Sequence, residues 1–197
     1  MRTAYSVVLL AMVVFSTGCF RSPSSRFYSL ISQQEAEANP SLSSEGMHLE
    51  VASIIFPHYL DDPRIAVRTG VNEVTRDEYE RWVEDLSVNF RQALLNDLAL
   101  ELKSSNVFSS DIYSQRRGNQ VLQVEVLQFD VSDEGRALLK VRWALGANRE
   151  ALSSAPLVLS EYMGTAEDGT SEARVAALSV LIDKLCRDVA GKVAASR

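Results

Sequence analysis

The chain has 197 residues, with 20 Lys and Arg against 26 Asp and Glu, and a formal net charge of −6 at pH 7. This length suits one domain with or without tails, and the acidity argues against binding to the phosphate backbone of nucleic acids. Two Cys and two His exclude a disulfide framework and a zinc cluster built from this chain's own His and Cys. Composition therefore predicts an ordinary globular domain without a metal, cofactor or nucleic-acid partner.

The first residues have the pattern of a secretory signal. Arg2 supplies a positive start, Val7–Phe15 is an apolar run, and the small residues of Ser16–Gly18 precede Cys19. The run is shorter than the ~20 residues that span a bilayer. Small residues directly before a Cys resemble the bacterial lipobox, which implies removal of residues 1–18 and lipidation of Cys19. The alternative is an ordinary signal peptide or membrane anchor with an incidental Cys.

The residue after the lipidated Cys bears on localisation. Under the enterobacterial sorting rule, Asp at this place retains a lipoprotein at the inner membrane, and Phe20 therefore predicts the periplasmic face of the outer membrane. Several acyl chains anchor a protein stably, whereas one does so only marginally. Residues 19–25 then form a lipidated tether. Residues 26–197 form one predicted domain, with a flexible loop at residues 32–46.

Apolar periodicity predicts the elements of the domain in chain order. The predicted strands are Arg26–Ile31, Met47–Phe56, Arg64–Thr69, the mostly extended Val71–Val83, Gln120–Val131, Leu138–Leu145 and Pro156–Met163. The turn Ser132–Gly135 joins two of them into a hairpin, and Val107–Tyr113 is short and mixed. A helix of about five turns starts near Asp85 or Ser87, and a second runs from Gly169–Ser171 to about Ala195. The predicted fold is α/β, with a mixed, partly antiparallel sheet of five or more strands and two long helices.

The sequence lacks the Gly-x-Ser-x-Gly, Walker and Gly-x-Gly-x-x-Gly motifs. His48 and His58 fall on different elements, and Asp61-Asp62 before Pro63 is typical of a turn that starts a strand. We therefore predict no enzyme, no catalytic residue and no metal site. An enzyme of the cell wall or of lipids remains an alternative that needs convergent side chains in one cleft.

Two further features have plain structural interpretations. Cys186 lies beside the apolar stripe of the last predicted helix, which predicts packing rather than redox chemistry. Acidic residues cluster within Asp77–Asp85. This cluster is either a solvated face or a docking surface for a basic partner.

A resemblance to a known family begins at Pro57. Five segments carry it: Pro57–Ile65, Arg68–Asn72, Arg81-Trp82, Asp85-Leu86 and Phe27–Leu30, the last soon after the lipidated Cys. Together they resemble the ABC-type transport auxiliary lipoproteins of the paraquat-inducible C (PqiC) type. The chain departs from the family at one place. After Trp82-Val83, where the family often has a Glu-Pro pair, this chain has Glu84-Asp85.

The resemblance implies a three-layer-like α/β fold and a role without catalysis. Such lipoproteins sit at the outer membrane and work with a mammalian-cell-entry (MCE) domain tunnel protein, which is anchored in the inner membrane. We therefore expect a docking or positioning subunit of a lipid transport system, which could assemble as a homo-oligomer and meets the inner-membrane partner only indirectly. The alternatives are a lipid-carrying periplasmic binding module and an outer-membrane assembly factor.

Four residues within the resembling stretch are candidates for a partner-contact surface: Tyr59, Arg64, Arg68 and Trp82. Each also has a structural interpretation. Trp82 could pack in the core, and the two arginines could pair with carboxylates along one strand. Trp143 is more simply a core residue of the hairpin.

Overall fold

The computed structural model describes residues 23–31, 47–113 and 115–196. The predicted signal peptide, Cys19 and the loop predicted at residues 32–46 lie outside these ranges. The strands are β1 (Arg26–Tyr28), β2 (Leu49–Ile55), β3 (Arg64–Arg68), β4 (Val74–Trp82), β5 (Val107–Ser109), β6 (Gln120–Ser132), β7 (Arg136–Gly146) and β8 (Val158–Thr165). The helices are the 3-10 turn η1 (His58–Leu60), α2 (Leu86–Glu101), α3 (Arg149–Leu152) and α4 (Ser171–Ala195).

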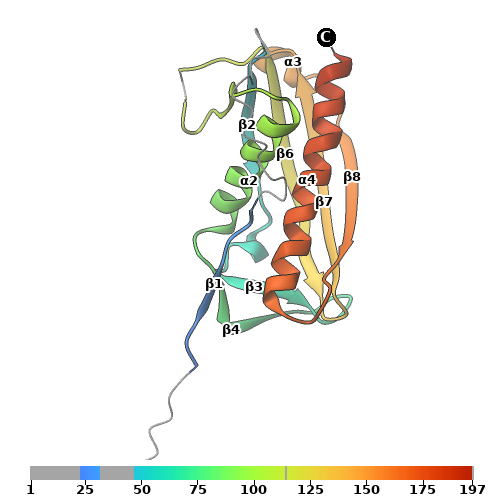
Figure 1. The fold of residues 1–197 in the computed structure, drawn as a ribbon. Coiled ribbons are helices and arrows are strands. Elements are labelled where there is room, and N and C mark those ends of the chain that lie inside the picture. The colour runs from blue at the N-terminus through green and yellow to red at the C-terminus, as the bar shows by residue number, and fades with distance from the viewer. Residues whose placement is uncertain (1–22, 32–46, 114, 197) are drawn as a thin grey trace, which may run out of the picture.

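The long strand β6 is the centre of the sheet (Figure 1). One edge of β6 pairs with β7 in antiparallel orientation, and β7 pairs in turn with β8. The other edge pairs with two different strands along its length, and we call the place where these two strands diverge the fork. The first half of β6 pairs in parallel with β2, next to β5, whereas its last residues pair in parallel with β3, which leads to β4 and β1. The described strands thus form one eight-stranded mixed sheet, and the predicted mixed, partly antiparallel sheet with two long helices is confirmed.

The predicted hairpin is formed by β6 and β7. Gly135 has a φ of +84° at the turn, which is a conformation that glycine adopts without the steric cost of a Cβ. The carbonyl of Ala166 lies 3.3 Å from where a Cβ of Gly135 would be, and the Gly135 carbonyl accepts the Ala166 N–H at 2.8 Å. Gly135 therefore ties the hairpin turn to the segment between β8 and α4.

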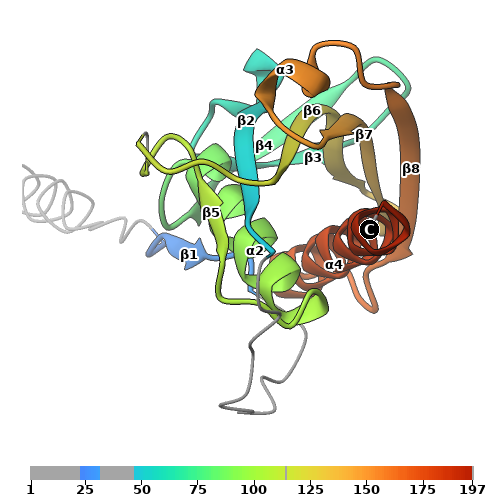
Figure 2. The same ribbon diagram turned by 90° about the horizontal axis from the view of Figure 1, so that it is seen from above.

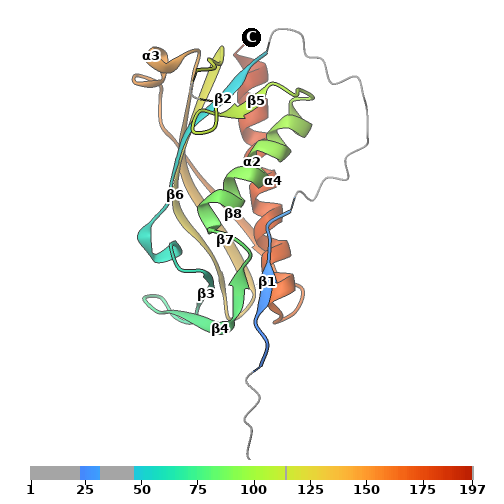
Figure 3. The same ribbon diagram turned by 90° about the vertical axis from the view of Figure 1, so that its left-hand side faces the viewer.

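Both long helices lie against the same face of the sheet (Figures 2 and 3). On β6 and β7, Phe129 and Leu139 are register partners and share a face. The ring of Phe90, on α2, meets that of Phe129 edge to face at 5.3 Å. Tyr162, the register partner of Leu139 on β8, donates its hydroxyl to Asp188 of α4 at 2.7 Å. Side chains from α2 and from α4 thus converge on one sheet face.

No long helix of the described residues covers the opposite face of the sheet (Figures 2 and 3). At one end of that face, the short helix α3 is held by Arg149, which forms an ion pair with the fully buried Glu50 of β2. Glu50 also accepts the N–H of Gly118 at 3.1 Å. On the covered face α2 and α4 also pack against each other, as the contact between Cys186 and the Leu94 carbonyl shows.

The apolar stripes predicted for the two long helices form the core. On α2, Phe90, Leu94 and Leu98 have 0% of their surface exposed. The N-cap of α2 is Asp85, as predicted, although its side chain makes no capping hydrogen bond. Helix α4 begins at the predicted place, where the Thr170 hydroxyl accepts the Ala173 N–H at 3.2 Å. The Thr170 cap accounts for the start of α4, and the apolar stripes account for the buried face of each helix.

Candidate functional site: the open sheet face around Asp130

A buried carboxylate sits in the fork beside β6. Asp130, near the end of β6, is 2% exposed. It lies beside the stretch of edge between the pairing with β2, which ends at Glu125, and the pairing with β3, which begins at Val131. The turn η1 fills this stretch with Tyr59, whose hydroxyl accepts the Phe129 N–H at 3.2 Å and donates to Asp130 at 3.0 Å. Tyr59 thereby accepts a hydrogen bond from a backbone N–H that pairs with neither β2 nor β3.

Arg68 completes the cluster from β3. Its Nη2 donates to Oδ2 of Asp130 at 2.6 Å and its Nε to Oδ1 at 3.3 Å, while Gln128 donates to Oδ1 at 2.9 Å. Burial, with the neighbouring Asp130 charge, raises the pKa of Tyr59 to about 12, and the hydrogen bond to Asp130 raises the pKa of Arg68. At neutral pH Tyr59 is therefore a neutral hydroxyl and Arg68 a charged guanidinium, and both donate to Asp130. These contacts connect η1 and β3 to β6 and so stabilise the fork.

Of the four residues proposed from the sequence, the structure brings together Tyr59 and Arg68. Arg64 lies on the same strand as Arg68 but binds Asp62 through Nε and Nη2, at 2.9 and 2.7 Å, and Glu78 at 3.1 Å. The hydrogen bonds from Arg64 hold the pKa of the Asp62 carboxyl well below its usual range. Asp62 also accepts the backbone N–H of Arg64 at 2.9 Å, as expected for an Asp that initiates the strand.

Trp82 and Trp143 are buried, at 5% and 4% exposure, and Trp82 lies in the core cluster. The structure thus agrees with the packing interpretation of both. It also places Cys186 in the core with 0% exposure, where burial raises the pKa of its thiol well above the ordinary value. A thiol in this setting packs rather than reacts.

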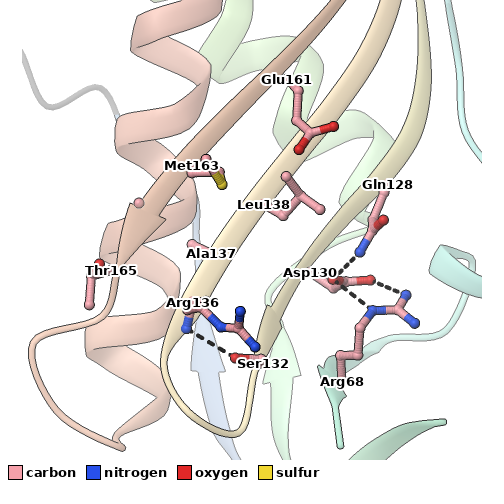
Figure 4. A pocket seen from close by; sticks show the side chains of 11 residues that line it. Arg68, Gln128, Asp130, Ser132, Arg136, Ala137, Leu138, Glu161, Met163 and Thr165 are labelled. Carbon is pink, nitrogen blue, oxygen red and sulfur yellow. Dashed lines mark hydrogen bonds and ion pairs between the residues drawn. The ribbon is translucent and has the colours of Figure 1, made fainter. Parts of the chain in front are cut away.

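The cluster forms one wall of a groove on the open face (Figure 4). The groove has a volume of about 460 Å³ and is also lined by Leu138, Glu161 and Met163. Asp130, Leu138 and Met163 form one cross-strand row, because they are register partners on β6, β7 and β8. The adjacent row ends at Glu161, which pairs with Lys140 at 3.3 Å.

Exposed apolar side chains on β8 and directly before it extend this surface beyond the groove. Leu159 and, just before the strand, Leu157 are 61% and 68% exposed, and Met163 in the groove is 70% exposed. β8 lies at the edge of the described sheet and has only β7 as a neighbour. Sequence reasoning identified the strand but not this surface, because alternation separates two faces without telling which one a helix covers. We call the outward side chains of β6, β7 and β8 between Asp130 and Leu159 the open face.

The acidic residues of β4 are partly used in ion pairs. Glu78 contacts both Arg64 and Arg81, and Glu80 contacts Arg26 of β1 at 2.8 Å. These contacts favour a structural use of the acidic cluster over a docking surface for a basic partner. Within the described residues, no three or more His, Cys, Asp or Glu side chains are placed to hold a metal ion.

Comparison with known proteins adds the decisive observation: residues 28–190 match the ABC-type transport auxiliary lipoprotein component family. This chain belongs to that family. The family is described by transport and not by a catalytic activity. No protein with a curated description matches the sequence.

Solved structures show the same fold. The crystal structure of an uncharacterized protein is similar with a TM-score of 0.69 and 16% identity, covering 87% of this chain and 99% of that one. A Xanthomonas campestris protein of the DUF330 family gives a TM-score of 0.68 and 16% identity, with coverage of 86% and 94%. The PelC dodecamer of Paraburkholderia phytofirmans gives 0.41 at 16% identity, with coverage of 72% and 87%, and supports no inference about assembly here. No helix in the described residues is both long and apolar enough to cross a membrane.

Proposed function

We propose that this chain is the outer-membrane lipoprotein subunit of an MCE-type intermembrane lipid transport system. In this role it is anchored through Cys19 at the periplasmic face, and it docks the outer end of the periplasmic tunnel protein. Membership of the transport auxiliary lipoprotein family supports the class of system. The small residues before Cys19 and the Phe at position 20 support the anchor and the choice of membrane.

The observation that favours docking over cargo carriage is the contrast between the interior and the open face. The space between the sheet and the two long helices is filled by side chains such as Phe90, Phe129 and Leu139, each at most 1% exposed. A lipid carrier must instead shield acyl chains, at about 0.8 kcal/mol for each methylene buried. The groove on the open face is a depression beside β8, and its mixture of exposed apolar side chains and ion pairs is typical of a protein contact surface.

The partner-contact surface that we propose is the open face. Arg68 lines its groove directly, and Tyr59 positions the Asp130 carboxylate to which Arg68 binds. Arg64 supports the same strand through Asp62, and Trp82 supports β4 from the core. The exposed Leu159 and Met163 are the side chains through which a partner would exclude water.

Co-purification of the tunnel protein with the lipidated chain from mild detergent tests this proposal. We expect Leu159→Lys to lower the recovery of the tunnel protein by about tenfold, since loss of a central apolar contact costs more than about 1 kcal/mol. The matched control is Ile112→Lys, which introduces the same charge at a side chain 62% exposed, after β5. Both variants should keep the unfolding midpoint of the parent.

Three results would contradict the proposal. The parent chain could recover no tunnel protein, or the two Lys variants could lose it equally. Cys19→Ala could also leave the chain in the membrane fraction, which would show that lipid on Cys19 is not what holds the chain there. Phospholipid found bound to the purified chain by native mass spectrometry would favour the lipid-carrying alternative.

A further inference from the structure

A second groove, of about 420 Å³, lies between the N-terminal segment and the first turns of α4. Phe27 and Ile31 line it on one side, and Val175 and Ala176 on the other. The two N-terminal side chains are 63% and 61% exposed. Among the described residues that line it, Glu172 is the one carboxylate. The groove is therefore a largely apolar surface beside the point where the chain leaves toward Cys19.

The segment that carries these side chains is fixed to the body of the protein. The Leu30 N–H donates to Asn89 of α2 at 3.0 Å, and the Ile31 N–H donates to Ser179 of α4 at 3.3 Å. β1 pairs in parallel with β4. Because three different elements hold the segment, its exposed side chains have a defined direction relative to the rest of the molecule.

The length of chain before β1 restricts how the molecule can sit on a membrane. Phe27 is eight residues after Cys19, and this stretch of chain can extend over at most about 29 Å. Helix α4 has 25 residues and is about 37 Å long. Its first turns line the groove, and its C-terminus lies at the opposite end of the molecule (Figure 1).

An inverted molecule, with the C-terminal end of α4 on the bilayer, would need a fully extended tether. The part of α4 between Val175, which lines the groove, and Ala195 spans about 30 Å, about the full reach of the residues that precede Phe27. Orientations that bring β1 and the start of α4 near the bilayer leave the tether slack.

We propose that the groove formed by Phe27, Ile31 and Val175 is a bilayer-contact site. Phe27 and Ile31 enter the boundary between lipid headgroups and acyl chains, where exposed apolar side chains leave water while nearby charges stay hydrated. The end of the molecule with α3 and the C-terminus then points into the periplasm. This inference rests on the lipid anchor of the proposed function, and it adds a second, non-covalent contact that sets the orientation.

Site-specific fluorescence on the lipidated full-length chain in phosphatidylethanolamine and phosphatidylcholine vesicles tests the site. Phe27→Cys and Leu159→Cys each carry one environment-sensitive NBD (nitrobenzoxadiazole) label, since Cys186 is fully buried and Cys19 carries lipid. We expect the label at position 27 to shift to the blue on reconstitution. Nitroxide-labelled phospholipid should quench it about twofold or more beyond the label at position 159, because only the former reaches the acyl boundary.

The outcomes separate the contact site from the anchor. If the chain floats with the vesicles but the label at position 27 stays in water, or is quenched no more than that at position 159, the contact site is refuted and the anchor stands. If the chain does not float, the anchor fails and the contact site fails with it. A blue shift that grows with protein concentration without nitroxide quenching would assign the groove to a second copy of the chain, and would also overturn the proposal.

Discussion

The two faces of β6, β7 and β8 both carry apolar side chains, but those side chains differ in exposure to solvent. On the face under the helices, Phe129 and Leu139 are at most 1% exposed, whereas Leu159 and Met163 on the opposite face are 61% and 70% exposed. Apolar residues occur on both faces of these strands, so residue type does not distinguish the faces. What differs is the layer above them. The covered face stabilises the fold, and the open face leaves apolar area available for a partner.

Truncation of a covered aromatic side chain should have the largest effect. Phe129 contacts Phe90 at 5.3 Å between ring centroids, and we expect Phe129→Ala to lower the free energy of unfolding by about 3–5 kcal/mol. Met163→Ala, on the open face, should cost less than about 1 kcal/mol because the side chain is already solvated. Urea unfolding measures both. Equal losses would show that the two faces contribute alike to stability.

Removal of the buried carboxylate comes next. Asp130→Ala leaves Tyr59 and Arg68 without their shared acceptor, and we expect a loss of about 3 kcal/mol, at the low end for a buried pair because Arg68 stays partly solvated. The matched control is Glu161→Ala in the same groove, where an exposed pair with Lys140 should contribute about 0.5 kcal/mol or less. A loss at Asp130 as small as that at Glu161 would contradict a bracing role for the fork.

Neighbouring residues of β8 offer a finer comparison. A Cβ added at Gly164 would lie 3.2 Å from Leu181 of α4, so Gly164→Val should push β8 away from the helix and cost about 1–3 kcal/mol. Met163→Val places the same side chain one residue earlier, on the open face, and should cost less than about 0.5 kcal/mol. The unfolding midpoints of the two variants test this, and a larger loss at Met163 would reverse the assignment of faces.

The smallest expected effect is a pH dependence from Tyr59. Burial raises its pKa to about 12, so the folded chain keeps this proton when the unfolded chain has lost it. The contribution to stability is complete below about pH 10 and falls as pH rises toward about 12. After allowance for partial solvation, we expect the loss to be about 1–2 kcal/mol.

Tyr59→Phe is the control for this dependence, because it removes the titrating hydroxyl and keeps the ring. Urea unfolding at about pH 9 and about pH 11.5 should show a smaller decrease for the variant than for the parent. If both lose stability in parallel over this range, the hydroxyl of Tyr59 does not titrate as its burial implies.

Much of the secondary structure follows from short-range pattern. Gln120–Val131 alternates along its whole length, the turn that follows contains Gly135, and Thr170 marks the start of α4. Each of these signals acts within a few residues of the chain. The hairpin and both long helices could therefore be predicted, with bounds that differ by a few residues from those of the structure.

The fork and the covered face could not be predicted, because they depend on contacts between distant parts of the chain. Asp130 is 71 residues from Tyr59 and 62 from Arg68, and nothing in the sequence marks these partners as neighbours. Tyr59 and Arg68 were identified through a family resemblance. Asp130 was missed, because a polar residue in an alternating strand usually indicates a solvated position.

The parallel pairing of β1 with β4 has a mechanical consequence. A pull on the chain before Arg26 acts along the direction of both strands, so it loads the hydrogen bonds of Arg26–Tyr28 together instead of opening them one after another. The same pull is shared by Asn89 and Ser179 on the long helices. A pull along β1 would therefore be resisted in shear, with the load spread over the strand and the two helices that hold these first described residues.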